Sequence, residues 1–207
     1  MHTKALNLSR SAVLKEVAKT GAFILGLALA ARIKVYLPFS PVPMTLQTLV
    51  VFLSAVSLGR RTFVMLGAYL ALGVLGAPVF SGGLGLAYLA GPTGGYIAGF
   101  FLASALLVKV LPLQKNLAWY ILSFLAADLI ILALGSLWLT LTLRMSLVHA
   151  LAVGALPFIY GDSLKIALAA LITNFVKIRN PNTCLPAGRS KFETNPNDQK
   201  SNSKIIV

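Results

Sequence analysis

Long apolar runs alternate with short polar connections along most of the chain. Six runs approach the length of a membrane crossing: residues 17–37, 45–58, 62–77, 93–111, 117–141 and 161–176. Because a crossing helix needs about 20 residues, the second, third and sixth runs require a locally thinned bilayer or partly re-entrant helices. A further apolar stretch, 148–160, could be a separate short helix or an extension broken at Pro157. The pattern predicts an all-α fold: a polytopic membrane protein with six transmembrane helices.

Composition supports this fold class. Of the 207 residues, 57% are hydrophobic and 11% are charged, whereas a soluble domain carries about 25% charged residues. Between residues 20 and 180 only Asp128 and Asp162 are acidic, and charge inside a membrane is costly enough to need a reason. A single cysteine, Cys184, and two histidines allow no internal disulfide and argue against a zinc site, so no metal or other cofactor is expected.

The basic residues indicate how the chain crosses the membrane. They lie between apolar runs and form no single patch, so the net charge of +13 does not indicate nucleic-acid binding. Of 18 Lys and Arg residues, all but Arg32, Lys34, Arg144 and Lys165 fall on one side of the predicted crossings. The positive-inside rule then places both termini in the cytoplasm. Residues 1–179 form the predicted membrane domain, and the polar segment 180–207 is a predicted disordered cytoplasmic tail.

The loops predicted to face outward are rich in proline and glycine. Pro38, Pro41 and Pro43 stiffen the first loop, and six glycines lie between residues 82 and 95 in the second. Glycine allows sharp turns and close approach to a ligand, and non-helical backbone at membrane depth is tolerated where it lines a cavity. Ordinary turn chemistry explains any one glycine, but the cluster favours a ligand pocket that faces out of the cell.

The segment Gly161-Asp162-Ser163-Leu164-Lys165 contains an acidic and a basic residue three positions apart. Asp162 is positioned to cap the sixth helix, and Lys165 falls on nearly the same helical face. An acceptor beside a donor suits a ligand with both kinds of group, such as a ureido ring or a carboxylate. A helix cap next to a lysine that extends to the membrane surface explains the pattern equally well.

Four other polar residues are candidates for the same pocket. Gln47 could hydrogen-bond a substrate or a neighbouring helix. Tyr96 could contact a ligand or anchor its helix at the membrane interface, and Thr93 could cap that helix. Ser81 is a further outward polar group. In the first run Ala22, Gly26 and Ala30 recur every four residues, a spacing that lets a helix of a partner, or of the same chain, approach closely.

Enzymatic function finds little support. The chain contains no G-x-S-x-G nucleophile motif, no H-E-x-x-H motif and no Walker A loop, so energy for active transport must come from another protein.

Asp128 could pair with a basic residue or relay protons, although no acidic residue is near it in sequence. Arg32 and Lys34 could attract an anionic ligand or extend to the interface. A membrane-embedded enzyme using Asp128 and Asp162, or a structural subunit, remains an alternative.

Five motifs in a fixed order carry a family resemblance: PVPMTLQT at 41–48, LGRR at 58–61, a segment 69–83 ending in PVFSGG, GPTGGYIAGF at 91–100 and PFIYGDSLK at 157–165. Together they resemble the BioY family, the biotin-specific substrate-capture (S) components of energy-coupling-factor (ECF) transporters. The resemblance implies six membrane helices, an outward biotin pocket, and high-affinity biotin capture for uptake across the cytoplasmic membrane. An S component for another vitamin is the nearest alternative.

The resemblance also implies partners and residue roles. The partners are biotin, a transmembrane coupling protein and two ATP-binding-cassette (ABC) ATPases. Asp162 would accept from a ureido N–H, and Lys165 would donate to the ureido oxygen or the carboxylate. Weaker implied contacts to substrate come from Gln47, Ser81, Thr93 and Tyr96. The ladder of Ala22, Gly26 and Ala30 resembles the first-helix surface that S components present to the coupling protein.

Overall fold

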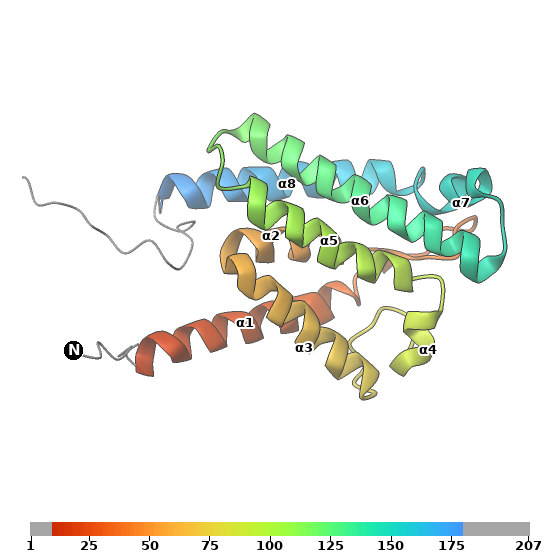
Figure 1. The fold of residues 1–207 in the computed structure, drawn as a ribbon, viewed down its shortest axis with the longest axis horizontal. Helices are drawn as coiled ribbons and strands as arrows, with labels where there is room; N and C mark the ends of the chain where they lie inside the picture. The colour runs from red at the N-terminus through yellow and green to blue at the C-terminus, as the bar shows by residue number, and fades with distance from the viewer. Residues whose placement is uncertain (1–9, 180–207) are drawn as a thin grey trace, which may run out of the picture.

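The computed structural model of this protein describes residues 10–179, and the predicted tail 180–207 lies outside them. The described chain is almost entirely helical (Figure 1). Its elements are α1 (Arg10–Ala30), β1 (Lys34–Val35), β2 (Met44–Thr45), α2 (Gln47–Leu58), the 3-10 helix η1 (Gly59–Arg61), α3 (Thr62–Val74), α4 (Gly85–Ala90), α5 (Gly94–Val110), α6 (Leu117–Leu143), α7 (Leu147–Gly154) and α8 (Phe158–Arg179). The six long helices, α1, α2, α3, α5, α6 and α8, correspond to the six predicted crossings.

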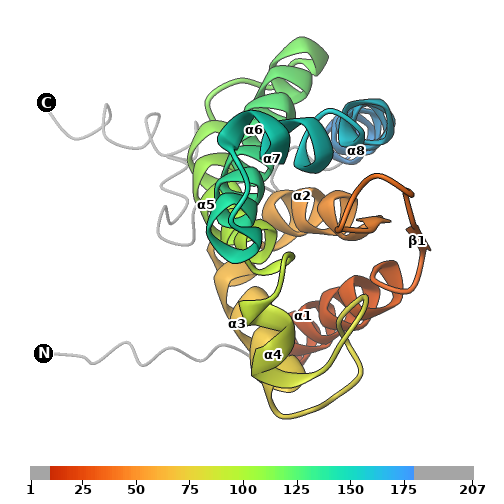
Figure 2. The same ribbon diagram turned by 90° about the vertical axis from the view of Figure 1, so that its right-hand side faces the viewer.

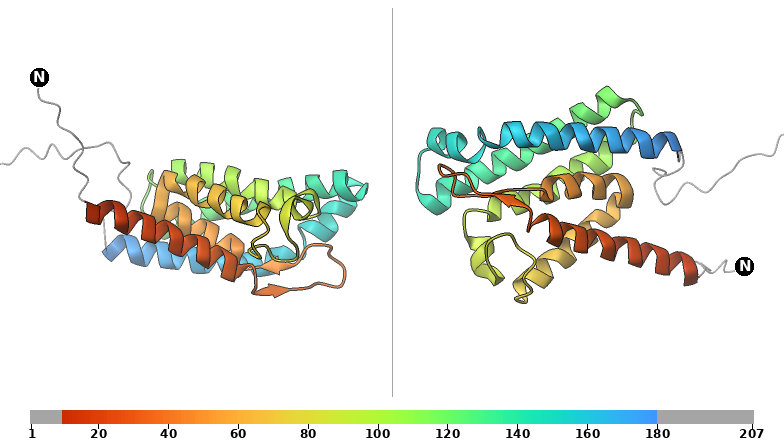
Figure 3. Two further views of the ribbon diagram at one scale, coloured as in Figure 1. Left: turned by 90° about the horizontal axis from the view of Figure 1, so that it is seen from below. Right: turned by 180° about the vertical axis from the view of Figure 1, so that it is seen from behind.

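The long helices run between two ends of the molecule (Figures 1 and 3). One end holds the start of α1, the α2–α3 turn, the α5–α6 turn and the end of α8. We call the other the pocket end; it carries the β1–β2 hairpin, α4 and α7, and Figure 2 views it directly. Because the first and last described helices reach the same end, the arrangement matches an even number of crossings.

Helices α5 and α6 pack closely along each other, and glycines permit this contact. A Cβ atom on Gly99 would lie 2.8 Å from the Ile131 Cα, so α6 occupies the space that a side chain would need. On the opposing helix, a Cβ atom on Gly135 would lie 2.3 Å from the Tyr96 ring. Small residues matter here because lipid is as apolar as leucine, so helices in a membrane associate through close packing.

Helix length and composition fit a multi-pass membrane protein. Three helical stretches of the described chain are long and apolar enough to cross a bilayer: Gln47–Val74, Leu117–Thr142 and Phe158–Val176; α5 is a shorter apolar helix. The first stretch divides at Gly59, whose φ of 56° favours glycine, so α2 and α3 are two separate helices as predicted. Leucines are exposed on the outside of several helices, as expected for a surface that contacts lipid.

The first helix ends earlier than predicted. The predicted run extended to residue 37, whereas α1 ends at Ala30 and the following residues enter a two-stranded antiparallel hairpin. In this hairpin Lys34 pairs with Thr45 and Val35 pairs with Met44. Apolar residues continue past Ala30 and hid the helix end. The paired strands satisfy backbone groups at both ends of the proline-rich loop.

Two other connections also differ from, or refine, the prediction. The last helix begins at Phe158 and not at residue 161, and α7 precedes it as a separate short helix. Most of the stretch 148–160 is therefore a separate short helix, and its last three residues begin α8. The glycine-rich loop contains a helix of six residues, α4, that was not predicted because so short a helix leaves no periodic signal.

Candidate functional site

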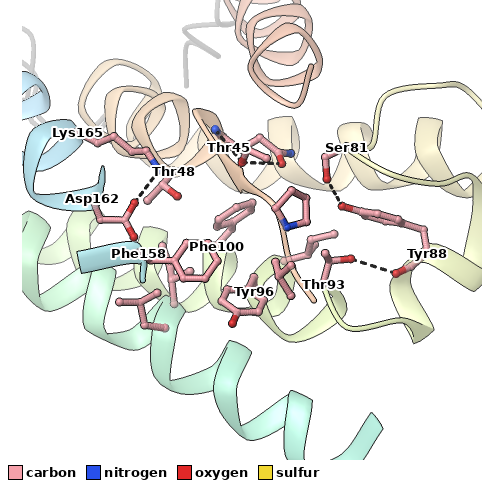
Figure 4. A pocket seen from close by; sticks show the side chains of 16 residues that line it. Thr45, Thr48, Ser81, Tyr88, Thr93, Tyr96, Phe100, Phe158, Asp162 and Lys165 are labelled. Carbon is pink, nitrogen blue, oxygen red and sulfur yellow. Dashed lines mark hydrogen bonds and ion pairs between the residues drawn. The ribbon is translucent and has the colours of Figure 1, made fainter. Parts of the chain in front are cut away.

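Two adjoining cavities lie at the pocket end. The inner cavity has a volume of about 50 Å³, and the outer one has a volume of about 420 Å³. Pro43, Ser81, Tyr88 and Thr93 line both of them. The structure brings all six candidate substrate-binding residues together around the inner cavity (Figure 4): Gln47, Ser81, Thr93, Tyr96, Asp162 and Lys165.

Asp162 and Lys165 form a buried ion pair in the wall of the inner cavity (Figure 4). The Lys165 Nζ lies 2.7 Å from the Asp162 Oδ1, and the two side chains are 7% and 4% exposed. Removing two charges from water is costly, and only close pairing with good geometry offsets this cost. An ammonium has three donors and a carboxylate has two acceptor oxygens, so the pair can also bind a ligand that presents both kinds of group.

The position of Asp162 corrects one prediction. Because α8 begins at Phe158, Asp162 lies beyond the start of the helix and does not cap it. Its carboxylate accepts from Lys165, which is 6% exposed and does not extend to the membrane surface. The alternative of a helix cap beside a surface lysine is therefore wrong, and the predicted placement of both residues on one helical face is confirmed.

Asp128 of α6 lies close enough to both members of the pair to interact with them electrostatically. It is 3% exposed, and its Oδ1 has no hydrogen-bond partner among the described residues. No acidic residue is near Asp128 in sequence, yet the fold brings Asp162 of α8 close to it. Lys165 is the basic residue within electrostatic range, but Asp128 forms no salt bridge with it among the described residues, so the expected pairing with a basic residue is not seen.

Gln47 connects the cavity wall to α3. Its Nε2 donates to the Tyr69 hydroxyl at 2.7 Å, and that hydroxyl donates to the Val79 carbonyl at 2.9 Å. The Thr45 hydroxyl donates to the Gln47 Oε1 at 3.2 Å. Gln47 therefore bonds a neighbouring helix, one of the two predicted roles, while it also lines the cavity. Tyr69 was missed because it stands within an apolar run.

Tyr88 of α4 lines both cavities and forms hydrogen bonds with two candidate residues, Ser81 and Thr93. Its hydroxyl lies 2.5 Å from the Ser81 hydroxyl, and its backbone carbonyl accepts from the Thr93 hydroxyl at 3.3 Å. Its ring stacks on Phe80, with the centroids 4.7 Å apart. Thr93 occupies the N-cap position of α5, but its side chain makes no capping bond, so that prediction is wrong.

Arg32 and Lys34 hold the loop that follows α3. Arg32 donates to the Pro78 carbonyl, and Lys34 donates to the Ser81 carbonyl at 2.5 Å. The Lys34 ammonium also lies 5.0 Å from the centroid of the Tyr36 ring. Both cations therefore connect the chain around the start of β1 to the loop after α3, and Lys34 does so at Ser81, which lines both cavities.

Tyr96 of α5 points its hydroxyl into the bundle. The hydroxyl donates to the Gly154 carbonyl at 2.6 Å, and the residue is 8% exposed. A tyrosine that anchors a helix at the membrane interface keeps its hydroxyl among the lipid headgroups, so the predicted anchoring role is wrong. Its side chain instead lines the inner cavity and bonds the end of α7.

The small residues of α1 do not share one environment. Ala22 is exposed, whereas Ala30 is 5% exposed. A Cβ atom on Gly26 would lie 3.9 Å from the Val50 Cγ1 of α2. The three residues therefore pass from the exposed surface at Ala22 into the bundle at Ala30. The part of this helix near Ala22 is the part available to another protein.

Comparisons with known proteins agree on one family. A sequence model of the BioY family matches residues 1–181. The biotin transporter BioY of Thermotoga maritima is 37% identical over 161 residues, covering 77% of this chain and 94% of that protein. The biotin transporter BioY of Rhizobium etli is 32% identical over 177 residues, covering 80% and 92%. The crystal structure of the S-component for biotin from an ECF-type ABC transporter has a TM-score of 0.74 at 25% identity, covering 83% and 95%.

Tyr96→Phe should lower the melting temperature of the protein in detergent. The change keeps the ring and leaves the buried Gly154 carbonyl without its donor, which costs about 1–3 kcal/mol. Tyr160→Phe is the matched control, because Tyr160 is 88% exposed. Melting followed by intrinsic fluorescence should separate the two variants; equal melting temperatures would contradict the structural role of the Tyr96 hydroxyl.

Proposed function

The chain belongs to the BioY family, and we propose that it captures biotin with high affinity for uptake across the cytoplasmic membrane, as the S component of an ECF transporter. Relatives that align with most of its length are named biotin transporters, and the similar solved structure is an S-component for biotin. The chain is accordingly a transport component and not an enzyme.

The buried Asp162–Lys165 pair is the observation that carries this proposal. A ureido ring presents two N–H donors on either side of one carbonyl acceptor. Asp162 accepts from a ureido N–H, and Lys165 donates to the ureido oxygen or to the carboxylate. A site built to hydrogen-bond such groups discriminates strongly against ligands that lack them, because its buried polar atoms would remain unpaired.

The two cavities together provide room for the vitamin. The inner cavity, at about 50 Å³, is much smaller than a usual small-molecule pocket of roughly 300–1,000 Å³. The outer cavity, at about 420 Å³, falls within the usual size of a small-molecule pocket. We infer that the ring system enlarges the inner cavity when it binds, and that the aliphatic chain with its carboxylate extends into the outer one.

The remaining candidate residues fall into two groups by position. Gln47 and Tyr96 line only the inner cavity, so they are placed to contact the ring system. Ser81 and Thr93 line both cavities and are placed to contact the ligand where it passes between them. Tyr88 joins the second group, because it lines both cavities and is bonded to both residues.

The partners and the orientation complete the proposal. The pocket end faces outward and both termini are cytoplasmic, which the distribution of Lys and Arg residues supports. A transmembrane coupling protein and two ABC-type ATPases supply the energy, since the chain has no Walker A loop. We propose that the coupling protein binds α1 around Ala22, Gly26 and Ala30, with the exposed Ala22 nearest to it.

Other functions have less support. An S component for another vitamin would share this fold, but the named relatives are biotin transporters. A membrane-embedded enzyme would need a nucleophile or a metal site beside its carboxylates. No group of three or more potential metal ligands occurs within the part of the chain that the structure describes. A purely structural subunit would not explain a charged pair lining a cavity.

Purified protein in detergent should bind biotin without ATP and without a partner. The pair is already formed in the isolated chain, so capture needs no energy input. Calorimetric titration with biotin, riboflavin and thiamine tests the proposal. Binding of riboflavin or thiamine, but not of biotin, would overturn it.

Asp162→Asn and Lys165→Ala should each weaken biotin binding by about tenfold or more, since a hydrogen bond to a charged group contributes about 1.5–3 kcal/mol. Ser163→Ala is the control; this exposed neighbour bonds the carbonyl of Ile159 in its own helix. Melting temperatures identify variants that fail to fold. Unchanged affinity in folded Asp162→Asn and Lys165→Ala would mean that the pair only stabilises the fold.

Ala22→Trp should spare biotin binding and abolish energised uptake, because the bulky ring would block a partner helix at an exposed position. Leu141→Trp on α6, where the leucine is 68% exposed, is the control for a large side chain facing lipid. Uptake of labelled biotin is measured in cells that also produce the coupling protein and the ATPases. Normal uptake by Ala22→Trp would contradict the proposed contact surface.

A further inference from the structure

The carboxylate of Asp128 remains unexplained by the binding site as described so far. It lies in the middle of α6, is 3% exposed, and is not among the residues that line either cavity. Its Oδ1 has no hydrogen-bond partner in the described part of the chain. An acidic side chain buried in a membrane helix is expensive to maintain, so it calls for a partner and a function.

The fold places Asp128 directly behind the binding site. Ile131 and Leu132 follow it by about one helical turn on the same face of α6, and both line the inner cavity. Helix α6 packs along α8, the helix that carries Asp162 and Lys165. Asp128 interacts electrostatically with both of these residues. Three ionisable side chains from two helices therefore lie within electrostatic range of one another behind the inner cavity, although Asp128 forms no salt bridge with Lys165 in the described part of the chain.

The group formed by Asp128, Asp162 and Lys165 has two carboxylates but only one ammonium. Without ligand, Lys165 donates to Asp162 at 2.7 Å. The Asp162 carboxylate has a second oxygen, so a ligand N–H that bonds it shares the carboxylate with Lys165 and weakens the ion pair. An ammonium whose only anionic partner is weakened in a low-dielectric interior is disfavoured. A second carboxylate within electrostatic range offsets this loss.

We propose that Asp128 is a positioning residue of the binding site, which holds the Lys165 ammonium in place when the substrate engages Asp162. Asp128 acts through Lys165 and does not touch the substrate. The proposal rests on biotin capture as the function. It adds the reason why a carboxylate that lines no cavity is buried behind the pocket.

A double-mutant cycle in biotin affinity tests this coupling. Asp128→Asn should weaken biotin binding by about tenfold when Lys165 is present, the size expected for two residues of one charged network. In the Lys165→Met background the same change should alter affinity by less than about threefold, because no ammonium remains to be held. Ser123→Ala, also buried on α6, is the control and should leave affinity unchanged. Unchanged affinity of Asp128→Asn, or an equal loss in both backgrounds, would overturn the proposal.

A second cycle needs no ligand and separates this proposal from the proposed function. Lys165→Met should lower the melting temperature strongly, because it leaves two buried carboxylates without a cation. The same change should lower it less in the Asp128→Asn background, where one carboxylate remains. Equal losses would show that Asp128 and Lys165 are not coupled. If wild-type protein binds no biotin, the function fails, and this melting cycle still decides the role of Asp128.

Discussion

The ion pair between Asp162 and Lys165 is the interaction on which the rest of the site depends. Two charges inside a membrane helix bundle are stable only if they are close together and if the surroundings exclude competing arrangements. The spacing of the two residues on α8 satisfies the first condition, since they lie 2.7 Å apart one turn from each other. The tertiary structure satisfies the second by burying both side chains.

The surrounding elements either bury the ion pair or leave a path by which a ligand reaches it. Close packing of α5 on α6, permitted by Gly99 and Gly135, forms the base of the pocket beside α8. At the open side, the β1–β2 hairpin and the loop after α3 are held together by Lys34. This division gives a rigid helical wall that carries the charges and a set of short connections around the outer cavity, where a ligand must pass.

Sequence reasoning found the parts of this structure that depend on local spacing. The six long helices follow from the apolar runs, and the shared face of Asp162 and Lys165 follows from their separation by three positions. Helix ends were predicted less well, because apolar residues continue into the β1–β2 hairpin. Tyr69 and the nearness of Asp128 to α8 could not be predicted, since each depends on segments distant in sequence. Tyr88 was missed because it lies in a short helix within a loop. All six candidate site residues line one cavity, a grouping that the family motifs anticipated and composition alone did not.

An experimental structure of the protein with biotin bound tests the central claim most directly. The account predicts the ureido ring in an enlarged inner cavity, with an N–H within hydrogen-bond distance of the Asp162 carboxylate and the Lys165 ammonium close to the ureido oxygen or the carboxylate. The Lys165 side chain should then also face Asp128. Biotin bound elsewhere, with the Asp162–Lys165 pair unchanged and out of contact with the ligand, would contradict the account.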